Sequence, residues 1–229
     1  MVKAVLLDID NTLLDFDAYV KSAMKDGFEK FGLGVYRDEM FDVFLSINNG
    51  LWREIEEGTL TFGELQKIRW NRIFDSLGIS FDGCRFETYF REYLFDSAIL
   101  VEGAHELLEY LKGRYILCVA SNGPFAQQLN RLTVGGLYPY FSHFFISEKI
   151  GASKPSKEFF SHCLEVLNRD DAISPSEIMV IGDSLTSDIA GAIDSGMKCC
   201  YFDRKGRGIG SGQEIDHVVG HLDEIRAFL

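Results

Sequence analysis

Short runs of apolar residues recur along the chain, and longer stretches with apolar residues at helical spacing separate them. The runs cover Ala4 to Leu7, Tyr115 to Ala120, Phe144 to Ile146, Ile178 to Ile181 and Cys199 to Phe202. Continuous apolar runs, as opposed to alternating ones, are typical of strands that are buried on both faces of a parallel sheet. The alternation of strand and helix patterns therefore predicts a doubly wound α/β domain.

One long stretch, residues 15–98, contains no convincing strand pattern. Apolar side chains recur at helical spacing from Phe16 to Phe31. Thr61 and Glu64 have the spacing of a capping box, and an apolar stripe follows them as far as Gly78. This stretch is predicted to be an all-helical insert.

The insert divides the rest of the chain into two parts. We predict a discontinuous core domain made of residues 1–14 and 99–229, with a helical cap domain over residues 15–98. Most of the aromatic residues of the chain lie in the insert, and they are expected to form its own hydrophobic core.

Composition narrows the class of protein. The 229 residues are 46% hydrophobic, which is enough for a sizeable core, and the net charge is −12. An acidic surface repels polyanions, so a nucleic acid polymer is not an expected partner. The start of the chain is unlike a signal peptide, and no apolar run approaches the ~18 residues that span a bilayer. With five scattered cysteines and no C-x-x-C pair, these features predict a reduced, cytoplasmic protein without a membrane partner.

Two carboxylates follow the first predicted strand. Asp8 and Asp10 lie where the strand ends, and ligands of open α/β sheets bind beyond the carboxyl ends of strands. Two carboxylates this close repel each other unless a cation joins them or one of them holds a proton. Both solutions suit phosphoryl transfer, in which one carboxylate is the nucleophile and the other an acid and base. A plain acidic turn is the alternative.

The second predicted strand leads into Ser121-Asn122-Gly123-Pro124. A hydroxyl at a strand end, followed by a small residue and a proline at a helix start, is typical of a seat for an anion, although an ordinary helix cap would have the same pattern. The glycine-rich stretch from Gly206 to Gly212 lacks the strand–loop–helix setting of a phosphate loop and predicts a mobile surface loop.

The strand ending at Ile181 leads into Gly182, Asp183 and, five residues further on, Asp188. Asp188 lies near a helix start, where a capping role would also explain it, whereas Asp183 directly follows four apolar residues and a glycine. Lys154, which precedes Pro155, could supply the fixed positive charge that a phosphate dianion needs among several carboxylates.

The order of these four signals resembles the motifs of the haloacid dehalogenase (HAD) superfamily. The matching positions are D-x-D-x-T at Asp8, Asp10 and Thr12, the hydroxyl residue Ser121, Lys154, and G-D-x-x-x-x-D with Asp183 and Asp188. The resemblance spans the whole chain. It implies a Rossmann-like core with an all-helical insert of the kind called a C1 cap, and Mg²⁺ chemistry through an aspartyl-phosphate. Oxygen ligands around a phosphate favour Mg²⁺, which Mn²⁺ could replace.

The resemblance also implies a role for each matching residue. Asp8 would attack phosphorus and bind the metal, and Asp10 would protonate the leaving oxygen, activate water and reach the metal through its backbone carbonyl. Asp183 would be a metal ligand, and Asp188 would orient the metal's water or Lys154. Residues with supporting roles would be Ser121 and the amides of Asn122 and Gly123 around the phosphate, Lys154 as a neutralising charge, and Thr12 in the first loop.

Three segments resemble the YjjG-type pyrimidine 5′-nucleotidases more closely. These are Asn49 to Trp52 in the insert, Ser121 to Gly123, and Ile146 to Pro155. The resemblance implies a small phosphorylated metabolite as the partner, namely a nucleoside 5′-monophosphate. Trp52 would then stack on the base or belong to the core of the insert.

Other activities remain open at this point. A phosphatase for a sugar phosphate or phosphoglycolate would need the same motifs, with a different fit to the leaving group. A haloacid dehalogenase uses the same nucleophile on carbon but needs no acid two residues later, so Asp10 argues against it. A phosphomutase would keep Asp10, and a binding protein that has lost catalysis would not need every position intact.

Overall fold

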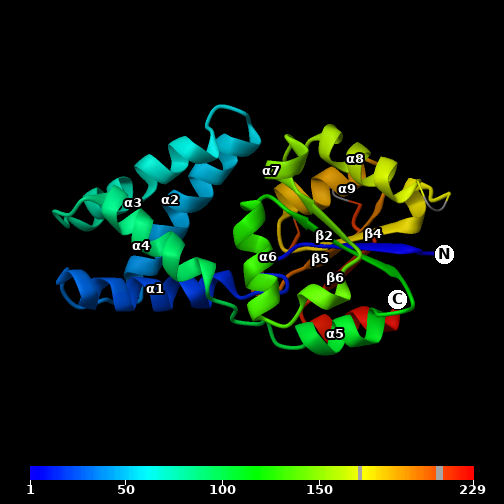
Figure 1. Ribbon diagram of the computed structural model, residues 1–229, viewed down its shortest axis with the longest axis horizontal. Helices are drawn as coiled ribbons and strands as arrows, with labels where there is room; N and C mark the ends of the chain where they lie inside the picture. Colours follow the sequence, from blue (N-terminus) through cyan, green and yellow to red (C-terminus); the bar gives the residue numbers. More distant parts are fainter. Residues whose placement is uncertain (170–171, 210–213) are drawn as a thin grey trace. The chain divides into compact units, whose positions relative to one another are not determined.

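The computed structural model describes residues 1–169, 172–209 and 214–229. It divides into two compact units, one made of Met1–Asp15 with Ala98–Leu229 and the other of Phe16–Ser97. We call them the core unit and the helical unit. Figure 1 colours the chain by sequence, so that the helical unit runs from blue to green.

The core unit is built on a six-stranded sheet with the strand order β3-β2-β1-β4-β5-β6. All neighbouring strands pair in parallel. The strands are β1 (Ala4–Leu7), β2 (Ile116–Ser121), β3 (His143–Ile146), β4 (Ile178–Gly182), β5 (Lys198–Phe202) and β6 (His217–Val219). The order is the Rossmann one, with the direction of winding reversing beside β1. The predicted doubly wound fold is confirmed, and β6 adds an edge strand that was not predicted.

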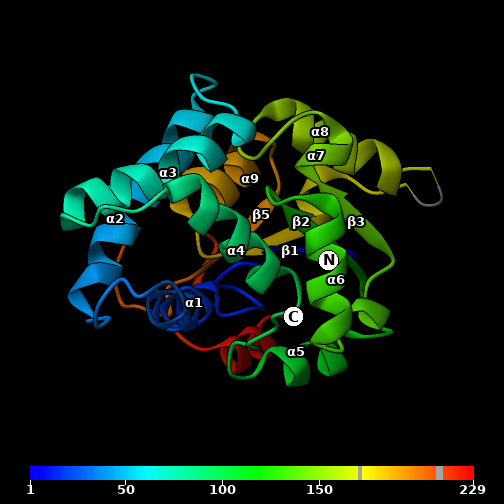
Figure 2. The ribbon, with the colours of Figure 1, turned by 60° about the vertical axis from the view of Figure 1, so that its left-hand side comes forward.

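Helices cover both faces of the sheet. They are α5 (Ala104–Leu111), α6 (Phe125–Val134), α7 (Ser147–Ile150), α8 (Lys157–Leu167) and α9 (Ala190–Asp194), with short helical segments η1 (Tyr138–Tyr140), η2 (Pro175–Glu177), η3 (Leu185–Ile189, a π-helical turn) and η4 (Leu222–Ala227). Figures 1 and 2 show α8 and α9 on one side of the strands and α5 on the other.

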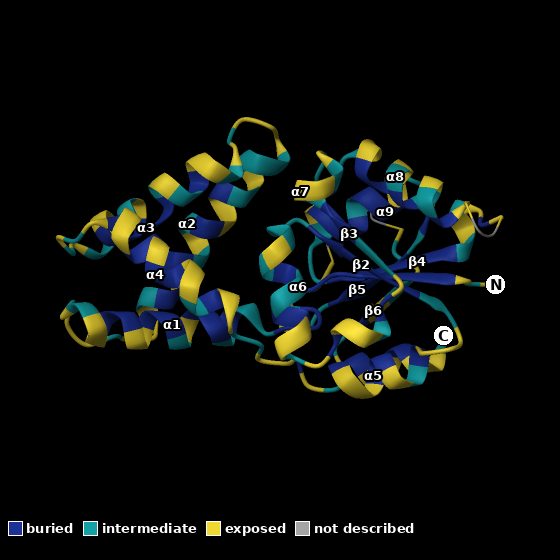
Figure 3. Ribbon diagram, viewed as in Figure 1, coloured by how far each residue is buried: buried dark blue, intermediate teal, exposed yellow. Residues whose placement is uncertain are grey.

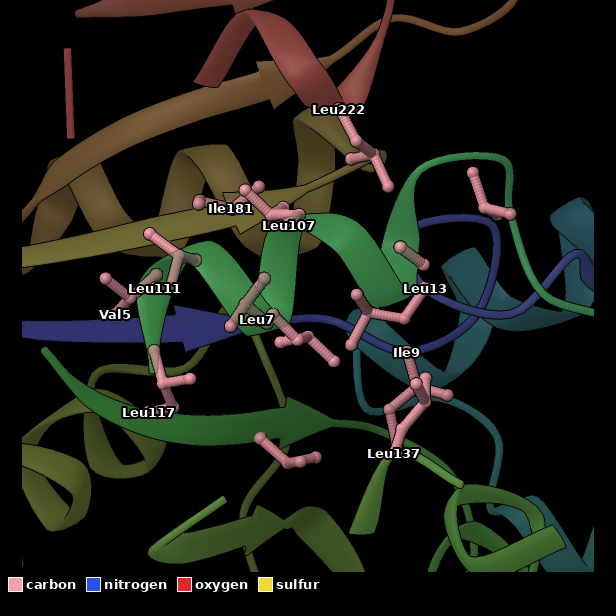
Figure 4. Close-up of a cluster of buried hydrophobic side chains, with 14 of the residues drawn as sticks. Val5, Leu7, Ile9, Leu13, Leu107, Leu111, Leu117, Leu137, Ile181 and Leu222 are labelled. Atoms are coloured by element: carbon pink, nitrogen blue, oxygen red, sulfur yellow. The ribbon is translucent and has the colours of Figure 1, made fainter. Parts of the chain in front are cut away.

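Alternate residues of β1 supply the hydrophobic cores on the two faces. Val5 and Leu7 pack with α5 in one cluster, and Ala4 and Leu6 pack with α8 in the other. Figure 4 shows the first cluster, in which Leu107 of α5 lies among side chains from the strands. Because both faces are covered, the inner strands β1, β2, β4 and β5 are buried along almost their whole length, which explains their uninterrupted apolar runs (Figure 3).

The register of the sheet brings three strand ends to one edge. Leu7 pairs with Val119 of β2 and with Ile181 of β4. Strand β1 ends at this level, while β4 continues by one residue and β2 by two, so Asp8, Asp183 and Ser121 come to the same edge of the sheet.

The chain leaves the core unit and returns to it at paired segments. The N–H of Asp15 donates to the carbonyl of Ile99 at 2.7 Å, and that of Val101 donates to the carbonyl of Leu13 at 2.9 Å. An antiparallel bridge joins Leu14 to Leu100 between them. The outgoing and incoming strands thus close on each other within the core unit.

The helical unit consists of α1 (Phe16–Phe31), α2 (Glu39–Glu56), α3 (Phe62–Leu77) and α4 (Gly83–Phe95). The capping box of Thr61 and Glu64 is present at the start of α3, and Gly78 ends that helix in the left-handed conformation. Both local predictions are confirmed. Aromatic side chains fill the interior of the unit, with Trp70 against Phe86 at 4.3 Å between ring centroids.

A charged pair is buried inside this aromatic core. Arg69 of α3 donates to both carboxylate oxygens of Glu87 on α4, at 2.7 to 3.1 Å, and to the side-chain oxygen of Asn48 on α2 at 3.1 Å. Trp52 lies elsewhere: it is half-buried, and its ring stands 5.7 Å from that of Phe62. Among the described residues, Trp52 is not a member of the unit's hydrophobic core.

Two further predictions concern membrane-spanning helices and the glycine-rich stretch from Gly206 to Gly212. Within the described ranges, no helix is long and apolar enough to cross a bilayer. Of the glycine-rich stretch, Gly206 and Gly208 are described, both at positive φ, and the Asp203 carboxylate accepts the N–H groups of Arg207 and Gly208 at 2.8 and 2.7 Å. Residues 210–213 lie outside the described residues.

Candidate active site

The carboxylate of Asp8 lies at the end of the central strand and contacts a buried lysine. The N–H of Asp8 still donates to the carbonyl of Ile181 in β4 at 2.9 Å, so the residue is held by the sheet. Its Oδ1 accepts from Lys154 Nζ at 2.7 Å. A backbone fixed by the sheet and a side chain fixed by the lysine give this carboxylate a defined direction.

Lys154 is 2% exposed and uses its three protons fully. Its Nζ donates to Asp8 Oδ1 at 2.7 Å, to Asp188 Oδ1 at 2.6 Å and to the carbonyl of Ala120 at 2.7 Å. Burial alone would lower the pKa of Lys154, but the charges of Asp188 and Asp8 outweigh it and raise the pKa. The lysine is therefore a permanent positive charge beneath the site.

The side chain of Asn122 fixes the backbone that carries this lysine. Its Nδ2 donates to the carbonyl of Lys154 at 2.9 Å, and its Oδ1 accepts the N–H of Lys154 at 2.8 Å. Asn122 was expected to offer only its backbone amide to a phosphate. The structure adds that its side chain joins the end of β2 to the loop between α7 and α8.

Three carboxylates meet beside Lys154. Oxygens of Asp8, Asp183 and Asp188 lie within 4.8 Å of one another. Burial, together with the charges of Asp8 and Asp188, raises the pKa of Asp183 well above its usual range, and Lys205 and Arg207 oppose that shift. Burial is also the largest cause that raises the pKa of Asp8 to about 7, against the opposing charge of Lys154.

This cluster fits a hard divalent cation. Three carboxylates lie close together and Lys154 contacts two of them, Asp8 and Asp188, so an excess of negative charge remains in a buried place and raises the pKa of Asp8 and Asp183. Carboxylate oxygens without a nitrogen or sulfur donor are the ligand type of Mg²⁺. The cluster includes Asp188, which was expected only to orient its neighbours.

Gly182 makes room for the Asp188 carboxylate. A Cβ on Gly182 would lie 2.1 Å from Asp188 Oδ2, so no other residue fits there without moving the acid. The same Oδ2 accepts the N–H of Ser184 at 3.1 Å. Asp188 stands in the π-helical turn η3 and not in the first turn of an ordinary α-helix. Its contacts are with the lysine and the loop, in addition to any capping role.

Asp10 directs its carboxylate toward α6. Its Oδ1 accepts from Arg131 Nη1 at 2.7 Å, and its Oδ2 accepts from Gln128 Nε2 at 2.8 Å. Each of the two carboxylates has its own cationic side chain as a partner, Lys154 for Asp8 and Arg131 for Asp10. The side chain of Asp10 is 33% exposed, so it remains open to solvent on one side.

Ser121 ends β2 with its hydroxyl inside the site. Its Oγ accepts from Gln128 Nε2 at 2.9 Å and from the N–H of Gly123 at 3.2 Å. The Gly123 amide, which we expected to bind phosphate, is thus used by the serine because the loop turns tightly between them. Helix α6 begins right after Pro124, as the sequence pattern predicts.

Thr12 is fully buried, and its N–H donates to the carbonyl of Ile9 at 3.3 Å. Its hydroxyl has no hydrogen-bond partner among the described residues. Any support that Thr12 gives to the first loop therefore comes from its backbone and its packing.

Gln128 and Arg131 were missed by the sequence analysis. Both are 1% exposed, on the buried face of α6 beside Leu132. A spacing of three residues puts them on one side of the helix, and two polar residues on an otherwise buried face are the signal that could have revealed them.

Asp183 also lines a small cleft. It is lined by Asn11, Asp183 and Tyr201 together with basic side chains of the loop after β5, among them Lys205 and Arg207. The cleft lies within the core unit and places one member of the acidic cluster, Asp183, near positive charge.

Comparison with known proteins identifies the family. A family model described as haloacid dehalogenase-like hydrolase matches residues 2–196. The HAD-hydrolase YfnB of Bacillus subtilis is 34% identical over 87% of this chain and 83% of that protein. Its crystal structure, bound to magnesium, superposes with a TM-score of 0.90 at 31% identity and covers 100% of this chain and 98% of that one.

Two further relatives have named activities. The pyrimidine 5′-nucleotidase PynA of Streptococcus pneumoniae is 33% identical over 87% of this chain and 83% of its own length. The pyrimidine 5′-nucleotidase YjjG of Escherichia coli is 27% identical over 98% of this chain and 96% of its own length. A family model that matches most of the chain and a relative that is 34% identical over 87% of it lead to one conclusion: this chain belongs to the haloacid dehalogenase-like hydrolases.

Proposed function

We propose that the protein is a Mg²⁺-dependent phosphomonoesterase that uses Asp8 as its nucleophile and acts on nucleoside 5′-monophosphates. The observation that carries the proposal is the position of Asp8. Its carboxylate stands at the end of the central strand, oriented by Lys154, with a second carboxylate two residues later that is held separately by α6. This is the arrangement that a nucleophile and a distinct acid–base group require.

In the first step, a carboxylate oxygen of Asp8 attacks phosphorus and the bond from phosphorus to the ester oxygen breaks. Asp10 gives a proton to the leaving oxygen. In the second step, Asp10 takes a proton from water, the water oxygen attacks phosphorus, and the bond to Asp8 breaks to release phosphate. The partial exposure of the Asp10 side chain is consistent with this exchange of protons with leaving group and water.

Other residues of the core unit hold the phosphoryl group. We assign the hydroxyl of Ser121 and the backbone amide of Asn122 to its oxygens, with the charge of Lys154 nearby. Asp8, Asp183 and the backbone carbonyl of Asp10 would hold Mg²⁺, and Asp188 would keep Lys154 in place. When bound, the metal supplies neutralisation of charge on the phosphoryl oxygens.

The nucleotide specificity rests on two observations. PynA and YjjG carry the name pyrimidine 5′-nucleotidase, and the chain matches most of the length of each. In the helical unit, the half-buried pair of Trp52 and Phe62 lies outside the hydrophobic core, so these rings are available for a flat ligand. We propose that Trp52 contacts the base.

The test is phosphate release with Mg²⁺ from nucleoside 5′-monophosphates, sugar phosphates and phosphoglycolate, with Asp8→Asn as the blank. Hydrolysis that prefers pyrimidine monophosphates and disappears in Asp8→Asn and with EDTA supports the proposal. Preference for sugar phosphates would retain the phosphatase and reject the nucleotidase. Substantial turnover by correctly folded Asp8→Asn would reject the nucleophile.

A further inference from the structure

Two buried polar residues of α6, Gln128 and Arg131, connect groups that the proposed reaction uses separately. We call them the α6 pair. Arg131 Nη1 donates to Asp10 Oδ1 at 2.7 Å and to Gln128 Oε1 at 2.9 Å. Gln128 in turn contacts both Asp10 and Ser121. One helix therefore reaches the loop after β1 and the end of β2 at the same time.

Both protons of the Gln128 amide are used, and they determine its orientation. An amide nitrogen has two protons, and Nε2 of Gln128 gives one to Asp10 Oδ2 at 2.8 Å and the other to Ser121 Oγ at 2.9 Å. Its oxygen accepts from Arg131. Reversing the amide would oppose oxygen to carboxylate, so the contacts determine which way it points.

These contacts also determine the direction of the Ser121 proton. A hydroxyl has one proton and two acceptor positions. Ser121 Oγ accepts from Gln128 Nε2 and from the N–H of Gly123, so both acceptor positions are occupied. Its proton has no acceptor among the described residues. The serine is thereby left as a donor, which is the form that binds a phosphate oxygen.

Burying the polar side chains of Gln128 and Arg131 makes the folded state less stable than apolar side chains at these positions would. Burying a guanidinium and an amide is unfavourable unless every group is paired, and Arg131 Nε is buried without a partner among the described residues. Gly123 must also lack a side chain, because a Cβ there would lie 2.4 Å from Gln128 Nε2. Apolar residues would fill this part of α6 at lower cost.

We infer that the α6 pair are positioning residues: Arg131 and Gln128 hold the carboxylate of Asp10 in the direction for proton transfer, and Gln128 also sets Ser121 to donate to the phosphoryl group. The inference rests on the proposed phosphatase reaction. In this inference, Arg131 orients only Asp10, whereas Gln128 orients both Asp10 and Ser121.

The experiment compares substrates that differ in their need for an acid. The p-nitrophenolate of p-nitrophenyl phosphate leaves without protonation, whereas the alkoxide of a nucleoside 5′-monophosphate requires it. For Gln128→Met and Arg131→Met, we expect kcat/KM for the monophosphate to fall ~10²-fold, the lower end of an acid's contribution, and that for p-nitrophenyl phosphate to fall only a few-fold. Arg131→Lys, which keeps the charge, should restore part of the loss.

A second readout separates the two residues. In the proposed reaction, inorganic phosphate is the product and should act as a competitive inhibitor that contacts Ser121. Gln128→Met should weaken inhibition by phosphate about 3- to 10-fold, the effect of one hydrogen bond, while Arg131→Lys should change it less than about 2-fold. Gln127→Met is the matched control, because Gln127 is the adjacent residue of the same helix and is half-buried away from these contacts.

Equal losses on both substrates would show that the α6 pair only supports the fold and would overturn the inference, as would unchanged kinetics. If Arg131→Met does not fold, Gln128→Met and Arg131→Lys still decide between these results. A wild-type protein that hydrolyses neither substrate would instead reject the proposed function, and the inference with it. A wild-type protein that is active, with variants that lose both substrates alike, rejects the inference alone.

Discussion

The ammonium group of Lys154 meets three oxygens at 2.6 to 2.7 Å inside the core unit. A buried ammonium without partners would be very unfavourable, and it is tolerated here because two carboxylates and a carbonyl surround it. The two carboxylates depend on the lysine in the same way. At the scale of single residues, removing any one of these charges would leave another buried without a partner and would destabilise the site.

A prediction at this scale concerns Gly182, to which the proposed reaction assigns no role. In Gly182→Ala, the new methyl group would overlap the Asp188 carboxylate and push it from Lys154. We expect kcat/KM to fall ~10²-fold, as for other displacements of about 1 Å. Circular dichroism should show an unchanged fold. Gly220→Ala is the control, because its Cβ would meet Glu224 only at an ordinary 3.7 Å; similar losses in both variants would contradict the explanation.

The residues at strand ends could be found from the sequence, because an apolar run followed by a carboxylate shows where a buried strand stops. The structure brings Asp8, Lys154, Asp183 and Asp188 together as that reasoning requires. Gln128 could not be found in this way. The three-residue spacing of Gln128 and Arg131 indicates that they share a face of α6, but it does not indicate which residues of the core unit that face contacts.

At the scale of elements, long apolar patterns were reliable and interrupted ones were not. The strands β1 to β5 were predicted from continuous apolar runs. The edge strand β6 has three residues and a half-exposed pattern, so it gives no such run. Helix α2 was not identified as a separate helix, because the buried Asn48 interrupts the stripe formed by Phe41, Phe44 and Leu51.

The same Asn48 belongs to the buried network with Arg69 and Glu87, which we expect to contribute strongly to the stability of the helical unit. In Glu87→Gln, the buried charge of Arg69 would lose its counter-charge, and the free energy of unfolding should fall by about 3 to 5 kcal/mol. Urea denaturation of the full chain measures it. The double variant Arg69→Met/Glu87→Leu removes both charges and should lose less than the single one.

The exposed ion pair between Arg72 and Glu54 provides the comparison. Its atoms are 3.5 Å apart and both side chains are open to solvent, so Glu54→Gln should cost less than about 1 kcal/mol. If the Glu54 and Glu87 variants lose equal stability, burial is not what makes the Arg69 pair important.

For the whole molecule, the buried carboxylates predict how stability changes with pH in the absence of metal. Burial raises the pKa of Asp8 from 3.8 to about 7, so between these values the native state holds a proton that the unfolded state has lost. Stability therefore falls as pH rises through this window. The EDTA-treated protein should melt at a higher temperature at pH 5.5 than at pH 8.

Metal should reverse this trend, because a cation binds the ionised carboxylates of the native state only. At pH 8, Mg²⁺ at about 100 times its Kd should add roughly 2.7 kcal/mol to the free energy of unfolding. Asp8→Asn should melt with a smaller pH dependence than the wild type and respond less to Mg²⁺. A wild type and Asp8→Asn with the same pH dependence would mean that the net charge of −12, and not this cluster, sets the trend.

Backbone hydrogen bonds join the segment by which the chain leaves the core unit, Leu13 to Asp15, to the segment by which it returns, Ile99 to Val101. We call these two segments the neck. None of the six strands of the sheet lies in the stretch between these two segments. During evolution, a recombination event at this neck could replace everything from Phe16 to Ser97 with a segment of another length and leave the strand carrying Asp8 in register. For protein engineers, the same neck is a graft point at which new recognition elements can be joined to an unaltered hydrolytic sheet.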